Sequence, residues 1–406
     1  MLMGIDQVKS LREKFIDGKK VALITNNSAR NGEGRPALDI IREMGGYRKL
    51  TLLTPEHGYF GDFQSGETVE SYFDQELGVE VESMYRAPDQ KQRKIGNQPI
   101  DIDQEMREID SIKDPSKYIS KEIARQFDTI IFDLQDVGCR IYTYIATMIY
   151  VMETISGTEI DFVVLDRPNP IQGKEPDGPI LLDSQQSFIG ALPVPIKHSL
   201  TIGELANFYN MKISHGNTRL NVVKMKGWKR DMWYDQLGIS WAFPSPNMPT
   251  LETATVYPGS VLLEGTNVSE GRGTTKPFQI IGAPWLNPKK VLSLLKNYNI
   301  GGVLLNEVKF KPCFSKYSEE KCNGIMINAT GRNVFKPFEF AIYLLSSISS
   351  AHGDKFAYHD HYFDSVAGNP AIRKGIVSGE RPDSIIEGYQ PELSQYVENL
   401  SDIVFS

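Results

Sequence analysis

Three polar segments combine carboxylates with arginine, histidine or tyrosine in a pattern that suits acid–base chemistry. Their sequences are PEHGYFG at 55–61, DLQDVGCRIYTY at 133–144 and EGTNVSEGRGTT at 264–275. A partly buried carboxyl group can hold a proton near neutral pH and give it to a leaving group. An arginine can bind a carboxylate through two parallel hydrogen bonds. Together the three segments indicate an enzyme that acts on a polar substrate.

Glu56 is the carboxylate that we expect to act as the general acid. It follows the apolar run 50–54 closely and precedes His57, which we expect to contact the substrate. A position at the end of a buried strand favours a raised carboxyl pKa, which suits proton donation near neutral pH. The alternative interpretation is structural, with Glu56 capping a helix or pairing with an arginine.

The second segment offers Asp136 as a further acid or base. Because side chains alternate along a strand, Asp133 and Gln135 point to one side and Asp136 lies beyond the strand end. Two interpretations of Arg140 stay open: a bidentate contact to a substrate carboxylate, or a structural ion pair with Asp136 across the turn. Tyr142 is a further candidate for contact with the substrate.

The third segment holds three glycines, two carboxylates, one arginine and four hydroxyl groups within twelve residues. Glycines allow a backbone to approach a ligand closely, so the loop is expected to bind a polyhydroxylated ligand. The alternative is a tight structural loop with internal caps. The candidate ligand-binding and catalytic residues are Glu264, Asn267, Glu270 and Arg272. The rigid turn 244–250 (PSPNMPT) adds Asn247 to the same cleft.

Apolar runs that alternate with helical patterns predict the elements that carry these segments. Buried strands are expected at 21–25, 50–54, 129–134 and 161–166. Strands separated by helices predict an α/β fold with a parallel, doubly wound sheet, whose ligands bind beyond the carboxyl ends of the strands. The polar segments that follow the second and third of these strands lie at that edge.

The second half of the chain is expected to form a smaller, mixed α+β domain. A chain of 406 residues exceeds one ordinary core, which favours two domains, 1–240 and 241–406. The pattern of the second domain predicts helix 288–297, strands 301–311 and 322–329, and helix 336–349. Thr201 and Glu204 fit a capping box, so Glu204 is predicted to be structural.

The composition argues against several partners. A net charge of −7 does not suit a nucleic-acid surface, and no run reaches the ~18 apolar residues of a membrane span. The start of the chain lacks the apolar core of a signal peptide, which favours a cytoplasmic location unless a leader has been removed. The three cysteines include no C-x-x-C pair, so a zinc knuckle is not expected.

Motifs of other enzyme classes are missing from the sequence. It has no G-x-S-x-G, no Walker phosphate loop and no H-E-x-x-H. Residues 32–37 fit G-x-G-x-x-A, but Gly32 lies seven residues after Thr25, whereas a dinucleotide fingerprint needs it at the strand end. We therefore expect neither a metal nor a cofactor, and a nucleotide-dependent oxidoreductase stays as an alternative.

Six blocks of the sequence together resemble the bacterial exo-β-N-acetylmuramidases, a family long known as a domain of unknown function. The blocks are PEHGYFG at 55–61, FDLQDVGCRIYTYI at 132–145, VLDRPNP at 164–170, TIGELA at 201–206, PSPNMPT at 244–250 and EGTNVSEGRGTTKPFQIIGAPW at 264–285. They span nearly the whole chain. Two departures are the missing signal peptide and a polar surface excursion at 86–120 that is longer than usual for the family.

The resemblance implies a Rossmann-like domain, a smaller domain and an active cleft between them. It also implies release of terminal N-acetylmuramic acid from the non-reducing end of peptidoglycan fragments, in cell-wall turnover and recycling. The partner is then a peptidoglycan-derived saccharide or muropeptide. A non-catalytic glycan-binding protein on the same fold stays as an alternative.

Cleavage of a glycosidic bond usually needs two carboxyl groups that flank it. We expect Glu56 to be the acid/base. The candidates for its partner are, in order, Glu270, Asp136 and Glu264, and the substrate's own 2-acetamido group is an alternative nucleophile. The lactyl carboxylate of N-acetylmuramic acid needs a local cation, for which the candidates are Arg140 and Arg272.

Overall fold

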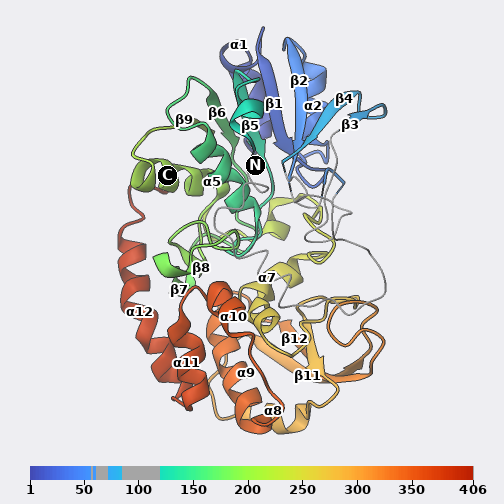
Figure 1. Ribbon diagram of the computed structural model, residues 1–406, viewed down its shortest axis with the longest axis vertical. Coiled ribbons are helices and arrows are strands. Elements are labelled where there is room, and N and C mark those ends of the chain that lie inside the picture. The colour runs from blue at the N-terminus through green and yellow to red at the C-terminus, as the bar shows by residue number, and fades with distance from the viewer. Residues whose placement is uncertain (56–57, 61–71, 85–118, 406) are drawn as a thin grey trace.

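The computed structural model shows two lobes, a larger N-terminal one and a smaller C-terminal one (Figure 1). It describes residues 1–55, 58–60, 72–84 and 119–405. Glu56, His57 and all but the last two residues of the excursion at 86–120 lie outside the described residues. In the described part, no helix has the length and apolar content needed to cross a bilayer.

Seven strands form the sheet of the larger lobe, in the order β3-β4-β2-β1-β5-β6-β9. Their bounds are β1 Lys20–Thr25, β2 Lys49–Thr54, β3 Tyr72–Asp74, β4 Val79–Ser83, β5 Thr129–Asp133, β6 Asp161–Leu165 and β9 Arg219–Val223. All neighbours are parallel except β3 and β4. The predicted doubly wound α/β sheet is confirmed, and each of the four predicted strands has its expected bounds to within one residue.

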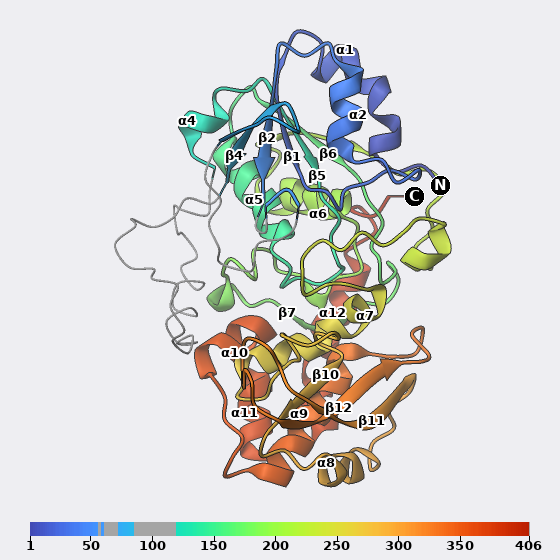
Figure 2. The ribbon, with the colours of Figure 1, turned by 90° about the vertical axis from the view of Figure 1, so that its right-hand side faces the viewer.

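Apolar side chains that alternate along the central strands bury both faces of this sheet. The described helices of the larger lobe include η1 Ile5–Leu11, α1 Arg12–Phe15, α2 Ala37–Met44, α4 Lys121–Ala124, α5 Tyr144–Thr154 and α6 Ile202–Phe208. Leu23 and Ile131 share a buried cluster with η1, α1 and α2, whereas Ile24 and Phe132 share one with α5 and α6 (Figure 2). Each fully buried side chain of this size contributes about 1.5–3 kcal/mol.

The smaller lobe contains an antiparallel sheet in the order β10-β12-β11, packed against helices. Its elements are α7 Leu251–Ser260, η6 Val261–Gly265, β10 Ile280–Ala283, α8 Pro288–Leu295, β11 Val303–Phe310, β12 Cys322–Ala329, α9 Pro337–His352, α10 Asp360–Ala367, α11 Pro370–Ser378 and α12 Pro382–Glu398. The predicted mixed α+β character is confirmed, as are α8, α9, β11 and β12. The strand β10 and the helices α10 to α12 were not predicted.

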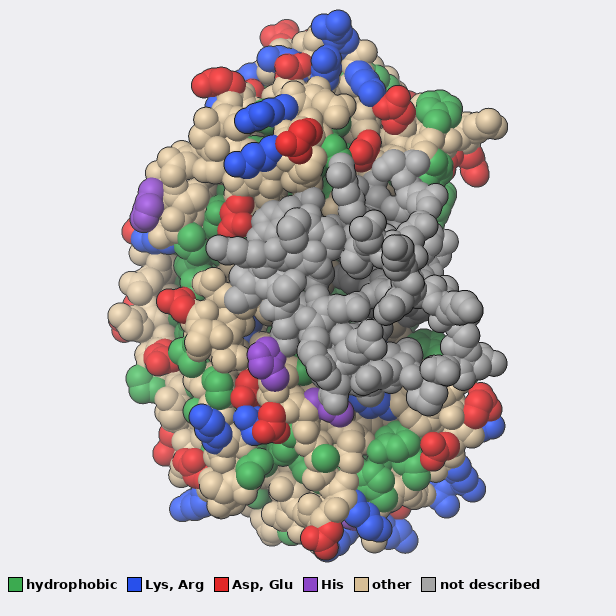
Figure 3. All heavy atoms as spheres, viewed as in Figure 1, with side chains coloured by type: hydrophobic (Ala, Val, Ile, Leu, Met, Phe, Trp, Pro, Cys, Tyr) green, Lys and Arg blue, Asp and Glu red, His purple; other side chains and the backbone are tan. Residues whose placement is uncertain are grey.

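Contacts between the lobes are extensive. One apolar cluster includes Phe132 of β5, Ile281 of β10 and Leu344 of α9. The hairpin of β7 (Asp177–Ile180) and β8 (Pro195–Lys197) lies between the lobes and contacts α12. The domain boundary at residue 240 stays a prediction. On the described part of the visible face, acidic and basic side chains are interspersed over both lobes (Figure 3).

Glu204 is structural, as predicted. It completes a capping box with Thr201 at the start of α6. Its buried carboxylate also accepts hydrogen bonds from Arg230 (2.7 Å) and from the backbone N–H of Phe405 (2.8 Å). The last residues of the chain thus return from the smaller lobe and bind to the larger one.

A buried ion pair joins the carboxyl ends of β5 and β6. Arg167 donates from Nε to Asp133 Oδ1 and from Nη2 to Asp133 Oδ2 (2.9 Å), and its third nitrogen donates to the carbonyl of Arg30 (2.8 Å). Neither side chain of the pair is more than 1% exposed. The pair therefore connects the loops that follow β1, β5 and β6 at the edge where a ligand is expected.

Replacing Arg167 with methionine should lower the free energy of unfolding by about 3–5 kcal/mol, because Asp133 is left buried without a partner. The double variant Asp133→Leu/Arg167→Met should recover most of this loss, since no charge stays unpaired. Urea unfolding followed by circular dichroism measures both. An equal loss in the single and double variants would contradict this account of the pair.

Candidate active site

The loops at the carboxyl edge of the larger sheet face the smaller lobe (Figure 2). The central neighbours β1 and β5 mark the point where the strand order reverses, since β2 lies on one side of β1 and β5 on the other. Such a switch point opens a crevice beyond the strand ends, and α/β sheets bind ligands there. Asn26 follows β1 and Asp136 follows β5, so both lie at this edge of the sheet.

Tyr144 ties the loop after β1 to the predicted cleft-lining turn 244–250. Its hydroxyl accepts a hydrogen bond from Asn26 Nδ2 (2.6 Å) and donates one to the carbonyl of Pro244 (2.6 Å). Asn247 is half-buried within that turn. The turn therefore lies against the carboxyl edge of the sheet, and contact of Asn247 with the substrate stays a prediction.

Asp136 is buried, and its carboxylate contacts a histidine that the sequence analysis missed. Asp136 Oδ2 accepts the backbone N–H of Gly138 (2.7 Å) and lies 3.2 Å from His198 Nε2. Because His198 Nδ1 accepts the N–H of Leu200 (3.1 Å), Nε2 carries the proton and donates to Asp136. Among the described residues, Asp136 Oδ1 accepts no hydrogen bond. A carboxylate oxygen in this position suits a hydrogen-bond donor of a ligand.

Arg140 has a structural role, which argues against the prediction that it binds a substrate carboxylate. The side chain is 2% exposed. It donates to four backbone carbonyls, those of Pro179 (3.1 Å), Val194 (2.8 Å), Val366 (3.1 Å) and Ala367 (3.0 Å). Burial lowers the pKa of Arg140 to about 10. The alternative ion pair with Asp136 does not form among the described residues either; the last two acceptors belong to α10, so Arg140 joins the lobes.

A row of aromatic rings connects the turn after β5 with the glycine-rich loop. The ring of Tyr142 lies 4.9 Å from that of Tyr144 and 6.4 Å from that of Tyr257 on α7. Tyr257 packs edge-on against Phe278 at 4.7 Å, and the guanidinium of Arg272 lies 5.1 Å from the centre of the Phe278 ring. Each aromatic pair adds about 0.5–1.5 kcal/mol beyond its buried area. The structure thus brings the predicted residues Tyr142 and Arg272 into one region.

Besides burial, carboxylates of the second and third polar segments both raise the pKa of one buried thiol, that of Cys139. Burial raises the pKa of Cys139 to about 12, and the negative charges of Asp136 and Glu264 act in the same direction. Asp136 of the second segment and Glu264 of the third are therefore both close enough to Cys139 to act on its thiol. The second and third polar segments therefore converge between the lobes.

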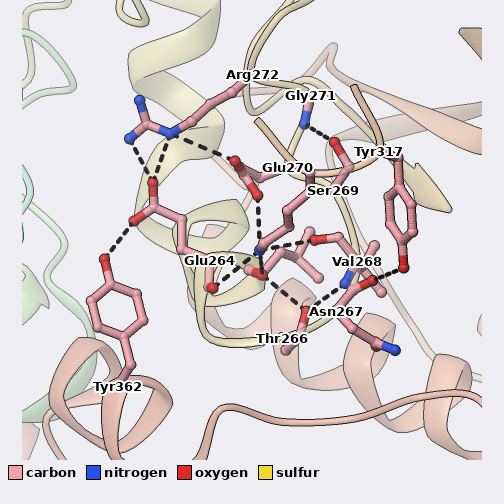
Figure 4. A network of polar contacts seen from close by, with 12 residues as sticks. Glu264, Thr266, Asn267, Val268, Ser269, Glu270, Gly271, Arg272, Tyr317 and Tyr362 are labelled. Atoms are coloured by element: carbon pink, nitrogen blue, oxygen red, sulfur yellow. Dashed lines mark hydrogen bonds and ion pairs between the residues drawn. The ribbon is translucent and has the colours of Figure 1, made fainter. Parts of the chain in front are cut away.

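Glu264, Glu270 and Arg272 belong to one ion-pair network (Figure 4). Arg272 donates to Glu264 Oε1 from Nε (3.0 Å) and Nη2 (2.6 Å), and its Nε lies 3.6 Å from Glu270 Oε1. The hydroxyl of Tyr362 on α10 donates to Glu264 Oε2 (3.2 Å). Lys316 Nζ donates to Glu270 Oε2 (3.1 Å). Two cations thus balance two carboxylates.

The members of this network differ in exposure. The side chain of Glu270 is 2% exposed, whereas those of Glu264 and Arg272 are 13% and 24% exposed. Burial acts to raise the pKa of Glu270, but Lys316 and Arg272 outweigh it and lower that pKa below its ordinary value. Glu270 is therefore ionised and enclosed, which argues against our first choice of it as the second catalytic group. Glu264 and Arg272 are the groups of the network that a ligand can reach.

Asn267 also has a structural role, and its predicted contact with the substrate stays a prediction. Its Nδ2 donates to the carbonyl of Lys355 (2.8 Å), and its Oδ1 accepts the N–H of Ala357 (2.9 Å). Both polar atoms of the side chain are thus used to fasten the glycine-rich loop to the segment before α10.

Glu56 and His57 lie outside the described residues, so their roles stay predictions. The flanking Pro55 and Tyr59 are both buried. The carbonyl of Tyr59 accepts the N–H of Asn27 (2.7 Å), which follows β1. The chain on either side of Glu56 and His57 therefore lies at the same edge of the sheet as Asn26.

The sequence family of the N-terminal region of exo-β-N-acetylmuramidase NamZ matches residues 21–102 and 96–252, and the family of its C-terminal region matches residues 255–404. The chain belongs to the NamZ family. A curated member, the peptidoglycan β-N-acetylmuramidase NamZ of Bacillus subtilis (strain 168), is 38% identical over 394 residues, which is 97% of this chain and 88% of the relative.

Two solved structures of DUF1343 family proteins from Bacteroides fragilis NCTC 9343 share the NamZ-family fold of this chain. One has a TM-score of 0.85 at 29% identity, and the other a TM-score of 0.73 at 25% identity. Each comparison covers 100% of this chain and 98% of the other protein. The two-lobed architecture described above is therefore similar to that of both proteins over their full length.

Asp166, directly after β6, is a further buried carboxyl group of the larger lobe. Its Oδ1 accepts the backbone N–H groups of Gly203 (2.9 Å) and Arg167 (3.0 Å). Burial raises the pKa of Asp166 to about 7; the N–H of Gly203 opposes this effect and the charge of Glu204 adds to it. The folded protein therefore binds this proton more tightly than the unfolded chain does.

The free energy of unfolding should fall as pH rises from about 4 to about 7, because Asp166 ionises at lower pH in the unfolded chain than in the folded protein. The size is on the order of 1.4 kcal/mol per pKa unit. Asp166→Asn keeps an oxygen acceptor for both N–H groups but carries no charge, so its stability should decline less over this range. Urea unfolding of both proteins at several pH values measures the difference, and parallel profiles would contradict the raised pKa.

Proposed function

We propose that this chain is an exo-β-N-acetylmuramidase that releases terminal N-acetylmuramic acid from the non-reducing end of peptidoglycan fragments. The observation that carries the proposal is the match of both NamZ regions, with 38% identity to the Bacillus subtilis enzyme over 97% of the chain. Convergence of Asp136, Tyr142, Glu264 and Arg272 between the lobes supports it, because these groups suit an acidic, hydroxylated sugar. The alternatives of a glycan-binding protein and an oxidoreductase are not favoured.

Glu56 is proposed as the general acid/base of the reaction. Pro55 and Tyr59, which flank it in the sequence, are buried, and the carbonyl of Tyr59 accepts the N–H of Asn27 directly beyond β1. Glu264 is the first proposed partner, because it is the most exposed of the three candidate carboxylates. Asp136 is the second; one of its oxygens accepts no hydrogen bond from the described residues, but the side chain is nearly as enclosed as that of Glu270. Each can stabilise positive charge that develops on the sugar ring, or orient the 2-acetamido group for attack.

Arg272 is proposed as the ligand of the lactyl carboxylate. Its Nε and one terminal nitrogen bind Glu264, and the other terminal nitrogen points away from both carboxylates (Figure 4). A planar guanidinium keeps donors on a second edge when the first is occupied. The burial of Arg140 leaves Arg272 as the better placed of the two predicted cations.

The reaction can be tested with a chromogenic β-N-acetylmuraminide. The wild-type protein should release the chromophore, and Glu56→Gln should lower turnover by at least about 100-fold, since general acid–base catalysis contributes on that scale. Glu43→Gln is the matched control, because Glu43 is exposed on α2 and should leave turnover unchanged. Binding of the muraminide by wild type without release would favour the glycan-binding alternative, and a Glu56→Gln rate near that of wild type would remove Glu56 from this role.

Arg272→Lys keeps the charge but removes the bidentate geometry. The preference for a β-N-acetylmuraminide over the matching β-N-acetylglucosaminide should fall by about 1.5–3 kcal/mol, roughly ten- to a hundredfold in kcat/KM. Arg332→Lys is the control, because Arg332 binds Asp235 with the same bidentate geometry on the surface (2.8 and 2.9 Å). An unchanged preference in Arg272→Lys would contradict the role of Arg272 in recognising the lactyl group.

A further inference from the structure

Lys316 occupies the centre of the turn from which Glu264 and Arg272 project. The residue lies between β11 and β12, and its side chain is 9% exposed. Nζ donates to the backbone carbonyls of Leu263 (2.8 Å), Glu264 (3.1 Å) and Val268 (3.2 Å), and to Glu270 Oε2 (3.1 Å). Four oxygen acceptors of the segment 263–270 thus contact one ammonium group.

Three carbonyls and a carboxylate around one point form an oxygen cage of the kind that proteins build for a cation. Here the ammonium of Lys316 fills that cage. It lies closer to Glu270 (3.1 Å) than Arg272 does (3.6 Å), so it is the nearer of the two cations that balance this buried carboxylate. It also donates to the carbonyls of Leu263 and Glu264 at the end of η6, where helix carbonyls lack intrahelical partners. Since Glu270 also lies 3.6 Å from Arg272 Nε, the contacts run from Lys316 through Glu270 to the exposed pair of Arg272 and Glu264.

The backbone on both sides of Lys316 has strained dihedral angles. Ser315, Tyr317 and Glu319 are non-glycine residues with φ of 67°, 59° and 62°. Such left-handed residues cost on the order of 1–3 kcal/mol each and persist where surrounding contacts hold them, often at functional sites. Tyr317 supplies such a contact, because its hydroxyl donates to the carbonyl of Asn267 (2.6 Å).

The glycine-rich loop is fitted to this segment at Gly273. A Cβ atom there would lie 2.5 Å from the carbonyl oxygen of Phe314, and the carbonyl of Gly273 accepts the N–H of Cys313 (2.9 Å). The loop and the segment 313–317 therefore form one unit, although 40 or more residues separate them in the sequence.

We propose that Lys316 and Glu270 are positioning residues of the active site. The ammonium of Lys316 serves as an internal cation that holds the turn 263–270 in one conformation. Glu270, which contacts both Lys316 and Arg272, in turn holds the side chain of Arg272 in place. The Arg272–Glu264 pair is thereby presented to the sugar in one orientation. This inference rests on the proposed function, and it assigns Glu270 to support of the site rather than to the chemical step.

The test is chemical rescue of Lys316→Ala, assayed on the chromogenic β-N-acetylmuraminide. The substitution removes a propylammonium-sized group, so kcat should fall by roughly ten- to a hundredfold, the scale of a misplacement of about 1 Å. Added n-propylammonium should restore a substantial part of kcat, because it returns N–H donors to the oxygen cage. Tetramethylammonium at equal ionic strength carries no N–H donor and should restore nothing.

Lys311→Ala is the matched control, because Lys311 is on the same connection but forms an exposed pair with Glu319. It should keep wild-type kcat with or without amine. If Lys316→Ala does not fold, the double variant Lys316→Met/Glu270→Gln, which leaves no buried charge unpaired, should fold and show the same loss of kcat.

The possible results distinguish failure of the proposed function from failure of the positioning role of Lys316. A wild-type protein that does not cleave the muraminide defeats the proposed function itself. An active wild type together with near-normal kcat in a folded Lys316 variant, or equal rescue by both ammonium ions, overturns the positioning role and leaves the proposed function intact.

Discussion

Charges that lie out of water must be matched by partners, and this requirement organises the region between the lobes. Asp133 is matched by Arg167, Glu270 by Lys316 and Arg272, and Glu204 by Arg230. Because removing one member of a buried pair costs several kcal/mol, each pair holds its two segments in one arrangement. The loops that carry polar residues to the cleft are therefore fixed by electrostatics as well as by packing.

The same contacts bind the lobes to each other. Arg140 leaves the turn after β5 and donates to carbonyls of α10, and the hydroxyl of Tyr396 on α12 donates to the carbonyl of His198 (2.9 Å), whose ring contacts Asp136. Both connections end within a few residues of the proposed site. Since the apolar cluster is also continuous across the lobes, the geometry of the cleft depends on the smaller lobe as much as on the sheet.

The fold was predictable where local pattern and tertiary environment agree. Short apolar runs such as 129–133 are buried on both faces, so composition alone marks them as strands. The brief strands β7 and β8 lack such a run and were missed. The structural contacts of Arg140 and Asn267 could not be predicted, because sequence shows which donors a residue has but not which acceptors surround it. The acceptors of Arg140 lie up to 227 residues away, and those of Lys316 up to 53, so neither role leaves a local signal.

The net charge of the site determines how the negative charge of an acidic substrate would affect the protonation of nearby carboxyl groups. Glu264, Glu270, Arg272 and Lys316 sum to zero, so the lactyl carboxylate of a bound muramic acid would make the region negative. Added negative charge favours the protonated form of a nearby carboxyl group. Under the proposed mechanism, the bound substrate would thus help to keep the general acid protonated until it gives its proton to the departing sugar oxygen. A neutral sugar lacks this effect, so the lactyl group would contribute to catalysis as well as to binding.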